Sequence, residues 1–291
     1  MDFSSLVVFK TVAKEGSISK AAKSLQYVQS NVTTKIKALE EELETVLFHR
    51  HSRGVTLTSS GQTLLNYAEQ IHFLIDEAKK AVRNYDVPQG SISIGSMETT
   101  AAVRLPRILT SYSCQYPNVE ILLETDTTAQ LIESVLSYEL EGAFIGGNVQ
   151  HPDLLTIPYL EEELVLISAN HCEVIDYKNT KLLVFRNGCT YRTKLEKWCH
   201  DYGVVSSRIM EFGSLEAIIG CVSAGMGISL VPHSVVSNKL DAGELRGIHL
   251  PKEYASVTTN FIHRRDLFST TAFLAFLEKC EMINKTAKEN N

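Results

Sequence analysis

The sequence predicts a multidomain chain: a winged helix-turn-helix domain, a long linker helix, and an α/β domain of two subdomains. The chain has 291 residues, more than one compact domain usually holds. Apolar residues recur at helical spacing as far as Tyr85, and a breaker at 87–90 follows. Beyond Pro88, short apolar runs alternate with helical patterns, which is typical of α/β folds. We therefore expect domains at 1–58, 59–87 and 88–291.

The composition indicates a globular chain without a membrane segment. Hydrophobic residues make up 44% and charged residues 21%, which is ordinary for folded domains. The first residues include Asp2, Lys10 and Lys14, and no signal-peptide core fits there. The longest apolar run, 217–232, is too short and too interrupted by glycine and serine to cross a bilayer. We expect a cytoplasmic protein.

Charge is unevenly distributed along the chain. The net charge of −6 argues against non-specific coating of nucleic acid. Residues 1–87 nevertheless carry a net +1, and the stretch from Lys20 to Lys37 holds four lysines and no acid. A basic stretch in an acidic protein suggests a local contact with nucleic acid, although many solvated helices look the same.

Two helices are predicted at the start of the chain. Apolar residues at helical spacing over 3–13 form the first, with Asp2 as its N-cap and Gly16 at its C-terminal end. Ser17 caps a second, short helix over about 18–25, with small apolar residues facing inward.

A third helix is predicted from Gln29 to Glu44 after a break at 26–28. Two short helices joined by a tight turn are the helix-turn-helix pattern, here about 18–37. Its inward face would hold Val32, Ile36, Leu39 and Leu43. Its outer face carries short polar groups and lysines that suit base edges and phosphates: Gln29, Ser30, Asn31, Thr33, Thr34, Lys35 and Lys37. A solvated amphipathic helix remains the alternative for this segment alone.

A β-hairpin is predicted over 49–58. Two short polar strands flank a turn at Arg53-Gly54. A hairpin beside a recognition helix is a wing, and its Arg50 and Arg53 would reach phosphates or a minor groove.

Spaced residues across these elements carry a family resemblance. The pattern resembles the LysR-type transcriptional regulator signature over about 60 residues. The residues are Leu6, Phe9, Val12, Gly16, Ser17, Ala21, Ala22, Leu25, Gln29, Ser30, Val32, Ile36, Leu39, Glu40, Leu43, Leu47, Phe48, Arg50, Arg53, Leu57, Thr58 and Gly61. The resemblance implies a DNA-binding regulator, activator or repressor, whose third helix reads DNA. Ser17 and Thr58 complete the expected DNA-binding set.

Two positions depart from the family pattern. Val28 stands where the family usually has a capping serine, and its loss should cost about 1 kcal/mol. Glu44 stands where the family usually has glycine, so the turn from helix to wing is expected to differ in shape.

A long helix is predicted from Thr58 to Tyr85, with Ser59 and Gln62 as a capping box. Its apolar positions are separated by gaps that alternate between four and three, the mark of a coiled-coil seam. The stripe comprises Leu57, Gly61, Leu64, Ala68, Ile71, Ile75, Ala78, Val82 and Tyr85. A helix roughly 42 Å long exceeds one small domain, so we expect pairing with another subunit. Packing against its own chain is the alternative; the resemblance favours a dimer or a dimer of dimers.

The remainder predicts an α/β domain with mainly parallel sheets. Expected strands are 91–95, 119–124, 142–146, 163–168, 181–185, 208–212, 227–231 and 257–263. Expected helices are 101–115, 129–138, 190–202, 215–224 and 269–283. This part also resembles LysR-type effector domains, which are similar to periplasmic binding proteins. The resemblance implies a first subdomain of about 91–161 and 266–285, and a second of about 162–265, joined by two crossover strands.

Hydroxyl groups cluster at expected helix starts beside the cleft. Ser96, Thr99 and Thr100 follow the first strand, and Thr127 and Thr128 follow the next. Free N–H groups at helix starts favour a carboxylate or similar anion as the effector. In relatives, the positions that match Thr99 and Thr128 contact effectors. Arg192 and Ser214 would face them across the cleft, with N-capping and a surface arginine as the alternatives.

Other function classes have weaker support. No catalytic or cofactor motif stands out, so we expect neither an enzyme nor a bound cofactor or metal. Six cysteines include no C-x-x-C pair, although Cys189 and Cys199 leave a redox-sensing regulator open. A ligand-binding α/β protein or enzyme without DNA function is the remaining alternative.

Overall fold

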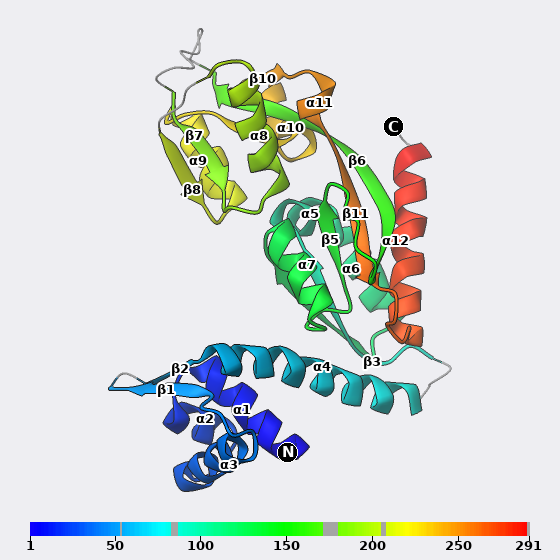
Figure 1. Ribbon diagram of the computed structural model, residues 1–291. Coiled ribbons are helices and arrows are strands. Elements are labelled where there is room, and N and C mark those ends of the chain that lie inside the picture. The colour runs from blue at the N-terminus through cyan, green and yellow to red at the C-terminus, as the bar shows by residue number, and fades with distance from the viewer. Residues whose placement is uncertain (53, 83–86, 171–179, 205–207, 290–291) are drawn as a thin grey trace. The chain divides into compact units, whose positions relative to one another are not determined.

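The computed structural model describes residues 1–52, 54–82, 87–170, 180–204 and 208–289 (Figure 1). The chain divides into two compact units. The first is Met1–Asn84 with Ser137–Glu139, and the second is Tyr85–Leu136 with Leu140–Asn291.

The N-terminal unit has the predicted order of elements. Three helices enclose a core that includes Phe9, Val12, Val32 and Ile36, all fully buried. A two-stranded hairpin and a long helix follow. The elements are α1 (Phe3–Glu15), α2 (Ile18–Ser24), α3 (Gln29–Glu42), β1 (Phe48–His51), β2 (Gly54–Leu57) and α4 (Ser59–Val82).

The first helix boundaries follow the predicted capping chemistry. Asp2 accepts the N–H of Ser5 at 2.6 Å, and Gly16 ends α1 with a φ of 60°. Ser17 accepts the N–H of Lys20 at 3.4 Å at the start of α2. At the start of α3, Val28 supplies no side-chain cap, because its apolar side chain has no hydrogen-bond acceptor.

The end of α3 corrects two predictions. The helix stops at Glu42, and Leu43, expected on the buried face, is 37% exposed. Glu44 adopts a φ of 50°, its N–H donates to Glu41, and the N–H of Thr45 donates to the carbonyl of Glu40. This hydrogen-bond pattern is a Schellman motif. The turn therefore keeps the shape expected of a glycine, with glutamate held in a left-handed conformation, and the predicted change of shape is wrong.

The hairpin leads into α4 through a tight junction. β1 and β2 pair antiparallel, with Phe48 opposite Leu57. Thr58 caps α4, because its Oγ1 accepts the N–H of Gly61 at 2.9 Å. The predicted Ser59–Gln62 capping box is therefore wrong. A Cβ at Gly61 would lie 2.2 Å from the carbonyl oxygen of Leu47, so only glycine fits there.

The apolar stripe of α4 has two different environments. Leu64, Ala68 and Ile71 pack against the core of the same unit, where α4 contacts α1. The expectation that the stripe finds no partner in its own domain is wrong for this half. Farther along the stripe, Ile75 is half-buried and Val82 is 88% exposed; Leu74, which lies beside the stripe, is 53% exposed. The predicted Tyr85 lies outside the described residues.

The second unit is a mixed α/β structure. Its main sheet has seven strands in the order β10-β6-β11-β5-β3-β4, with β9 also pairing with β6. The first-half elements are β3 (Gly90–Ser96), α5 (Glu98–Val103), α6 (Leu105–Gln115), β4 (Val119–Thr125), α7 (Thr128–Leu136), β5 (Gly142–Gly146) and β6 (Leu154–Ala169). The second-half elements are β7 (Leu182–Phe185), α8 (Thr190–Asp201), β8 (Ile209–Phe212), α9 (Leu215–Ser223), β9 (Ser229–Pro232), α10 (His233–Asp241), β10 (Leu245–His249), α11 (Lys252–Ala255), β11 (Ser256–Arg264) and α12 (Thr271–Glu289).

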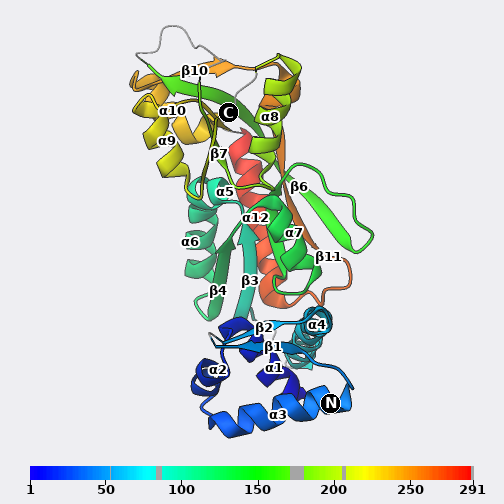
Figure 2. The ribbon, with the colours of Figure 1, turned by 60° about the vertical axis from the view of Figure 1, so that its left-hand side comes forward.

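Strand direction corrects the expectation of mainly parallel sheets. β3 pairs in parallel with β4 and β5, and β7 with β8. β11 is antiparallel to β5 and β6, and β6 is antiparallel to β9 and β10. The long strands β6 and β11 pass from one subdomain to the other and back (Figure 2). Because they run side by side in opposite directions, they make the sheet mixed.

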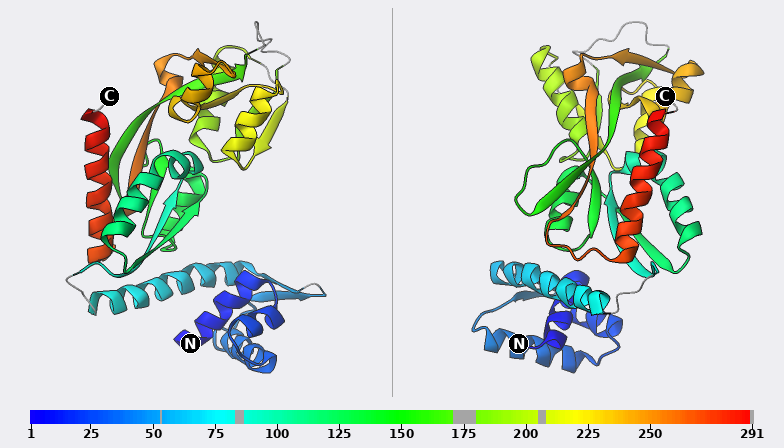
Figure 3. Two further views of the ribbon diagram at one scale, coloured as in Figure 1. Left: turned by 180° about the vertical axis from the view of Figure 1, so that it is seen from behind. Right: turned by 90° about the vertical axis from the view of Figure 1, so that its right-hand side faces the viewer.

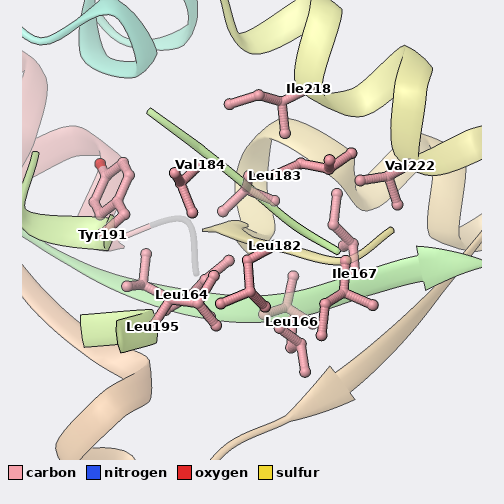
Figure 4. Packing of buried hydrophobic residues seen from close by; sticks show 14 of the residues in the cluster. Leu164, Leu166, Ile167, Leu182, Leu183, Val184, Tyr191, Leu195, Ile218 and Val222 are labelled. Carbon is pink, nitrogen blue, oxygen red and sulfur yellow. The ribbon is translucent and has the colours of Figure 1, made fainter. Parts of the chain in front are cut away.

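Each subdomain has its own core. In the first, α6 and α12 cover one face of the sheet and α7 the other; Figure 3 shows α12 beside the crossover strands. In the second, residues from β6, β7 and α9 interdigitate, including Leu164, Leu183 and Ile218 (Figure 4). Val257 belongs to the second core and Phe261 to the first. The return between subdomains thus lies within β11, several residues before the predicted 265.

Some elements were not predicted. The expected helix 101–115 is two helices that meet at Arg104, and β10, α10 and α11 were missed. β6 begins at Leu154, well before the expected strand at 163. Among the described residues, no helix combines the length and apolarity that crossing a membrane requires.

Candidate DNA-binding surface and ligand cleft

The outer face of α3 carries the polar residues that were predicted to meet DNA. Most of these side chains are exposed, and two are half-buried. The exposed ones are Gln29, Ser30, Asn31, Thr34 and Lys37, and the half-buried ones are Thr33 and Lys35.

Local hydrogen bonds restrict what several hydroxyl groups can do. Thr33 and Thr34 donate to the carbonyls of Gln29 and Ser30, each at 2.9 Å, so their oxygens are available chiefly as acceptors. Ser17 serves as the cap of α2. Thr58 donates to the Val46 carbonyl at 2.8 Å while it caps α4. DNA contact by these hydroxyls stays a prediction.

Glu40, a residue for which no role was predicted, connects the wing to α3. Glu40 Oε1 accepts the N–H groups of Leu47 and Phe48, at 2.9 and 3.3 Å. Its Oε2 lies 3.8 Å from Nη2 of Arg50, whose side chain is exposed on the wing. Arg53 lies outside the described residues.

A pocket of about 180 Å³ opens between the two subdomains of the second unit. Predicted residues Thr99, Thr127 and Thr128 line it, at the starts of α5 and α7. The remaining lining residues are Met97, Glu98, Thr125, Asp126, Phe185, Arg186, Cys189, Tyr191, Phe212 and Gly213.

Four predicted effector residues lie outside the pocket wall. Ser96 and Thr100 are buried, and the Ser96 hydroxyl donates to the Met97 carbonyl. Arg192 is neutralised by Glu196 and Glu211, at 2.8 and 2.7 Å. Ser214 caps α9 by accepting the N–H of Ala217. Their assignment to the effector site is therefore corrected.

Polar contacts join the subdomains around the pocket. The hydroxyls of Thr99 and Tyr191 lie 3.0 Å apart. Glu98 Oε1 accepts the N–H of Leu215 at 3.0 Å, so a carboxylate from α5 sits at the start of α9. Thr190 donates to the Gly146 carbonyl at 2.8 Å. The pocket is thus enclosed by a set of contacts that opening of the cleft would break.

Three charged lining residues were missed. Asp126 directly follows β4, and Arg186 directly follows β7. Both stand at carboxyl ends of strands, which is the usual ligand position in such folds. Their positions directly after predicted strands could therefore have identified them as pocket residues. Burial raises the pKa of the Glu98 carboxyl, and neighbouring Glu216 adds to the shift.

A buried polar network lies where β6 passes between subdomains. The Glu162 carboxylate is buried and accepts the hydroxyls of Tyr191 and Thr259, at 3.3 and 3.2 Å. Arg104 Nε lies 3.6 Å from Oε1 of the same carboxylate. Because Tyr191 also lines the pocket, this network connects the ligand site to the crossover.

The cysteine geometry disfavours a redox switch between Cys189 and Cys199. Cys189 is the N-cap position of α8 and Cys199 lies in its last turn. Ten helical residues span about 15 Å, whereas a disulfide needs Cα atoms within roughly 7 Å. Burial raises the pKa of Cys189, and it raises the pKa of Cys199 to about 11. The described residues hold no cluster of His, Cys, Asp and Glu suited to a metal ion.

Comparisons with known proteins agree with both units. The model for the bacterial regulatory helix-turn-helix protein, lysR family, matches residues 3–62, and that for the LysR substrate binding domain matches 86–282. The chain is 50% identical over 281 residues to the HTH-type transcriptional regulator GltR of Bacillus subtilis (strain 168), covering 95% of each chain. It is 46% identical over 290 residues to SoxR of Arthrobacter sp. (strain TE1826), covering 99% of this chain and 100% of that one.

Solved structures show the same fold. Full-length CbnR complexed with its target DNA matches with a TM-score of 0.69 at 22% identity, covering 97% of this chain and 99% of that one. Full-length OxyR from Pseudomonas aeruginosa matches with a TM-score of 0.67 at 20% identity, covering 98% and 94%. With two family models that together span most of the sequence, the chain belongs to the LysR family of DNA-binding transcriptional regulators.

Proposed function

We propose that this regulator reads its operator through the outer face of α3, with the wing on adjacent backbone, and that a small molecule in the subdomain cleft changes its DNA binding. The observation that carries the proposal is the exposed polar face of α3 held beside the wing by Glu40. Gln29 and Asn31 suit base edges, and Lys35, Lys37 and Arg50 suit phosphates.

The cleft supports the second part of the proposal. The pocket is bordered by contacts between subdomains, such as Thr99–Tyr191 and Glu98–Leu215. A ligand that binds one arrangement of these contacts more tightly shifts the equilibrium toward that arrangement. A group that carries negative charge fits Arg186 and the helix start at Thr128.

Oligomerisation through α4 would give the two-fold symmetry that operators of such regulators require. The exposed apolar side chains Tyr67, Leu74 and Val82 support this part of the proposal. A second copy of α4 would cover them.

A gel shift with the DNA upstream of the gene tests the proposed function. The full-length protein should retard this fragment at moderate salt and leave a shuffled fragment of equal length unbound. Absence of any selective shift, in purified protein and in cell extract that supplies the natural ligand, would count against sequence-specific regulation.

A further inference from the structure

The pocket of the second unit carries both signs of charge. Glu98 and Asp126 line one part of it, and Arg186 lines another. This mixture differs from what a simple anion site needs, since two carboxylates would repel an anionic ligand at close range.

Arg186 is a cation without a protein partner among the described residues. No hydrogen bond or ion pair of its guanidinium occurs within the described part of the chain. Arg192 and Arg104, by contrast, face carboxylates. The Arg186 Nη2 lies only 3.0 Å from where a Cβ of Gly213 would stand, so the glycine leaves room for the guanidinium at the pocket wall. The guanidinium is therefore available to an anionic group of a ligand.

Glu98 is a carboxylate without a cationic contact. It accepts one hydrogen bond, from Leu215, and is partly buried. Arg186 is near enough to act on the pKa of Glu98, yet the two form no ion pair in the described structure. Asp126 accepts the N–H of Thr127 and is exposed toward the same pocket. Charges of opposite sign therefore line the same pocket, with no ion pair between Arg186 and Glu98 in the described structure.

The size and apolar lining restrict the ligand further. The pocket is small, with a volume of about 180 Å³, which suits a small metabolite. Met97, Phe185 and Phe212 offer apolar surface for a short side chain.

We propose that the effector is a small zwitterion of the α-amino-acid class, with its carboxylate on Arg186 and its ammonium between Glu98 and Asp126. The proposal rests on the proposed function, because it names the ligand class of the same cleft. A dicarboxylate would bring a second anion against Glu98. A diamine would bring a cation against Arg186. Only a ligand that carries both charges close together pairs with Arg186 and also with the two carboxylates.

Calorimetric titration of the full-length protein without DNA tests the proposal. The proteinogenic L-α-amino acids are tested one at a time, each beside the carboxylic acid that lacks the amino group and the amine that lacks the carboxyl group. At least one amino acid should bind saturably. Both of its half-ligands should bind roughly tenfold more weakly or worse, since each loses one charge-assisted contact.

Two charge-removing variants distinguish the two walls. Glu98→Gln keeps an acceptor for Leu215 and should weaken the amino acid and the amine, but not the carboxylic acid. Arg186→Gln should weaken the amino acid and the carboxylic acid, but not the amine. Glu133→Gln on α7 and Arg107→Gln on α6 are exposed, lie outside the pocket, and should change none of the affinities.

Three results would overturn the zwitterion. The first is that the carboxylic acid binds as tightly as the amino acid. The second is that Glu98→Gln raises the affinity for the amino acid. The third is that no amino acid binds to protein that still shifts its DNA. Amino-acid binding by protein that shifts no DNA would instead overturn the proposed function and leave the ligand assignment standing.

Discussion

Glu40 accepts the backbone N–H of Leu47 at 2.9 Å, so one carboxylate joins the last turn of α3 to the first strand of the hairpin. The same oxygen accepts the N–H of Phe48, and both residues are buried. The wing is therefore positioned by a side chain of α3 as well as by its own two-stranded pairing.

Replacing Glu40 should loosen the wing. Glu40→Ala leaves two buried N–H groups without their acceptor, which costs about 1–3 kcal/mol. Hydrogen exchange of the Leu47 and Phe48 amides should accelerate, and DNA affinity should fall. Glu41→Ala removes an exposed carboxylate one residue away and should change neither. Equal protection of these amides in both variants would show that Glu40 does not hold the wing.

Glycine at position 44 should stabilise the N-terminal unit. Glu44 has a φ of 50° in the Schellman motif that ends α3. A side chain in this conformation costs roughly 1–2 kcal/mol, and the extra freedom of glycine in the unfolded chain offsets part of the gain. Glu44→Gly should therefore add about 0.5–1 kcal/mol of local stability, measured by hydrogen exchange of the α3 amides.

The matched control for this change lies three residues earlier. Glu41→Gly introduces the same residue inside the helix, where right-handed geometry gives glycine no advantage, and should cost up to about 1 kcal/mol. The two variants should change the local stability in opposite directions. If both destabilise the unit, backbone strain at Glu44 is not the explanation.

Arg50 should contribute to DNA binding without contributing to sequence choice. Its side chain is exposed on the wing, and its ion pair with Glu40 is long, at 3.8 Å. If it meets a phosphate, Arg50→Ala weakens operator and random DNA alike, and the slope of log affinity against log salt decreases by about 0.9. Arg53→Ala is expected to act in the same way. Lys239→Ala, at a half-buried lysine that pairs with Glu244 in the second unit, should leave the slope unaltered. An unaltered slope for Arg50→Ala would place its side chain away from phosphates.

The predicted order of elements in the N-terminal unit is confirmed because the signals were local. Asp2, Gly16 and Ser17 act within one helical turn, and cap chemistry is readable from neighbouring residues. The partner of an apolar stripe is a tertiary property. The repeat along α4 identified a buried face, but could not say that Leu64 and Ala68 pack against the core of their own unit.

The exposed half of α4 should hold copies of the chain together. Leu74 is 53% exposed on an otherwise amphipathic helix. Leu74→Asp would place a charge in an apolar interface and should shift sedimentation equilibrium toward monomer. Lys79→Asp lies roughly 140° farther around the helix and should leave the oligomer intact. Identical masses for both variants and the wild type would direct attention to another interface.

The sequence predicted where the cleft lies, but only some of the residues that line it. Thr99, Thr127 and Thr128 line the pocket because helix starts after parallel strands meet at one edge of a sheet. Arg192 was expected there instead of Arg186, six residues before it. Arg192 instead pairs with Glu196, one turn along α8, and with Glu211, a distant residue that sequence spacing does not reveal.

The pair Arg104–Glu162 at the subdomain crossover should show strong coupling. Glu162 is buried, and removal of Arg104 leaves its carboxylate without the nearby cation, which costs on the order of 1–3 kcal/mol. Arg104→Met should therefore lower the unfolding temperature, which can be measured by the fluorescence of Trp198, the sole tryptophan, in the second unit.

The double variant Arg104→Met, Glu162→Gln removes both charges and keeps an acceptor for Tyr191 and Thr259. It should be more stable than Arg104→Met alone, because no uncompensated buried charge remains. The free-energy changes of the single variants Arg104→Met and Glu162→Gln could instead add up to that of the double variant. The 3.6 Å pair would then contribute no coupling, and the Tyr191 and Thr259 hydroxyls would hold the network at the crossover.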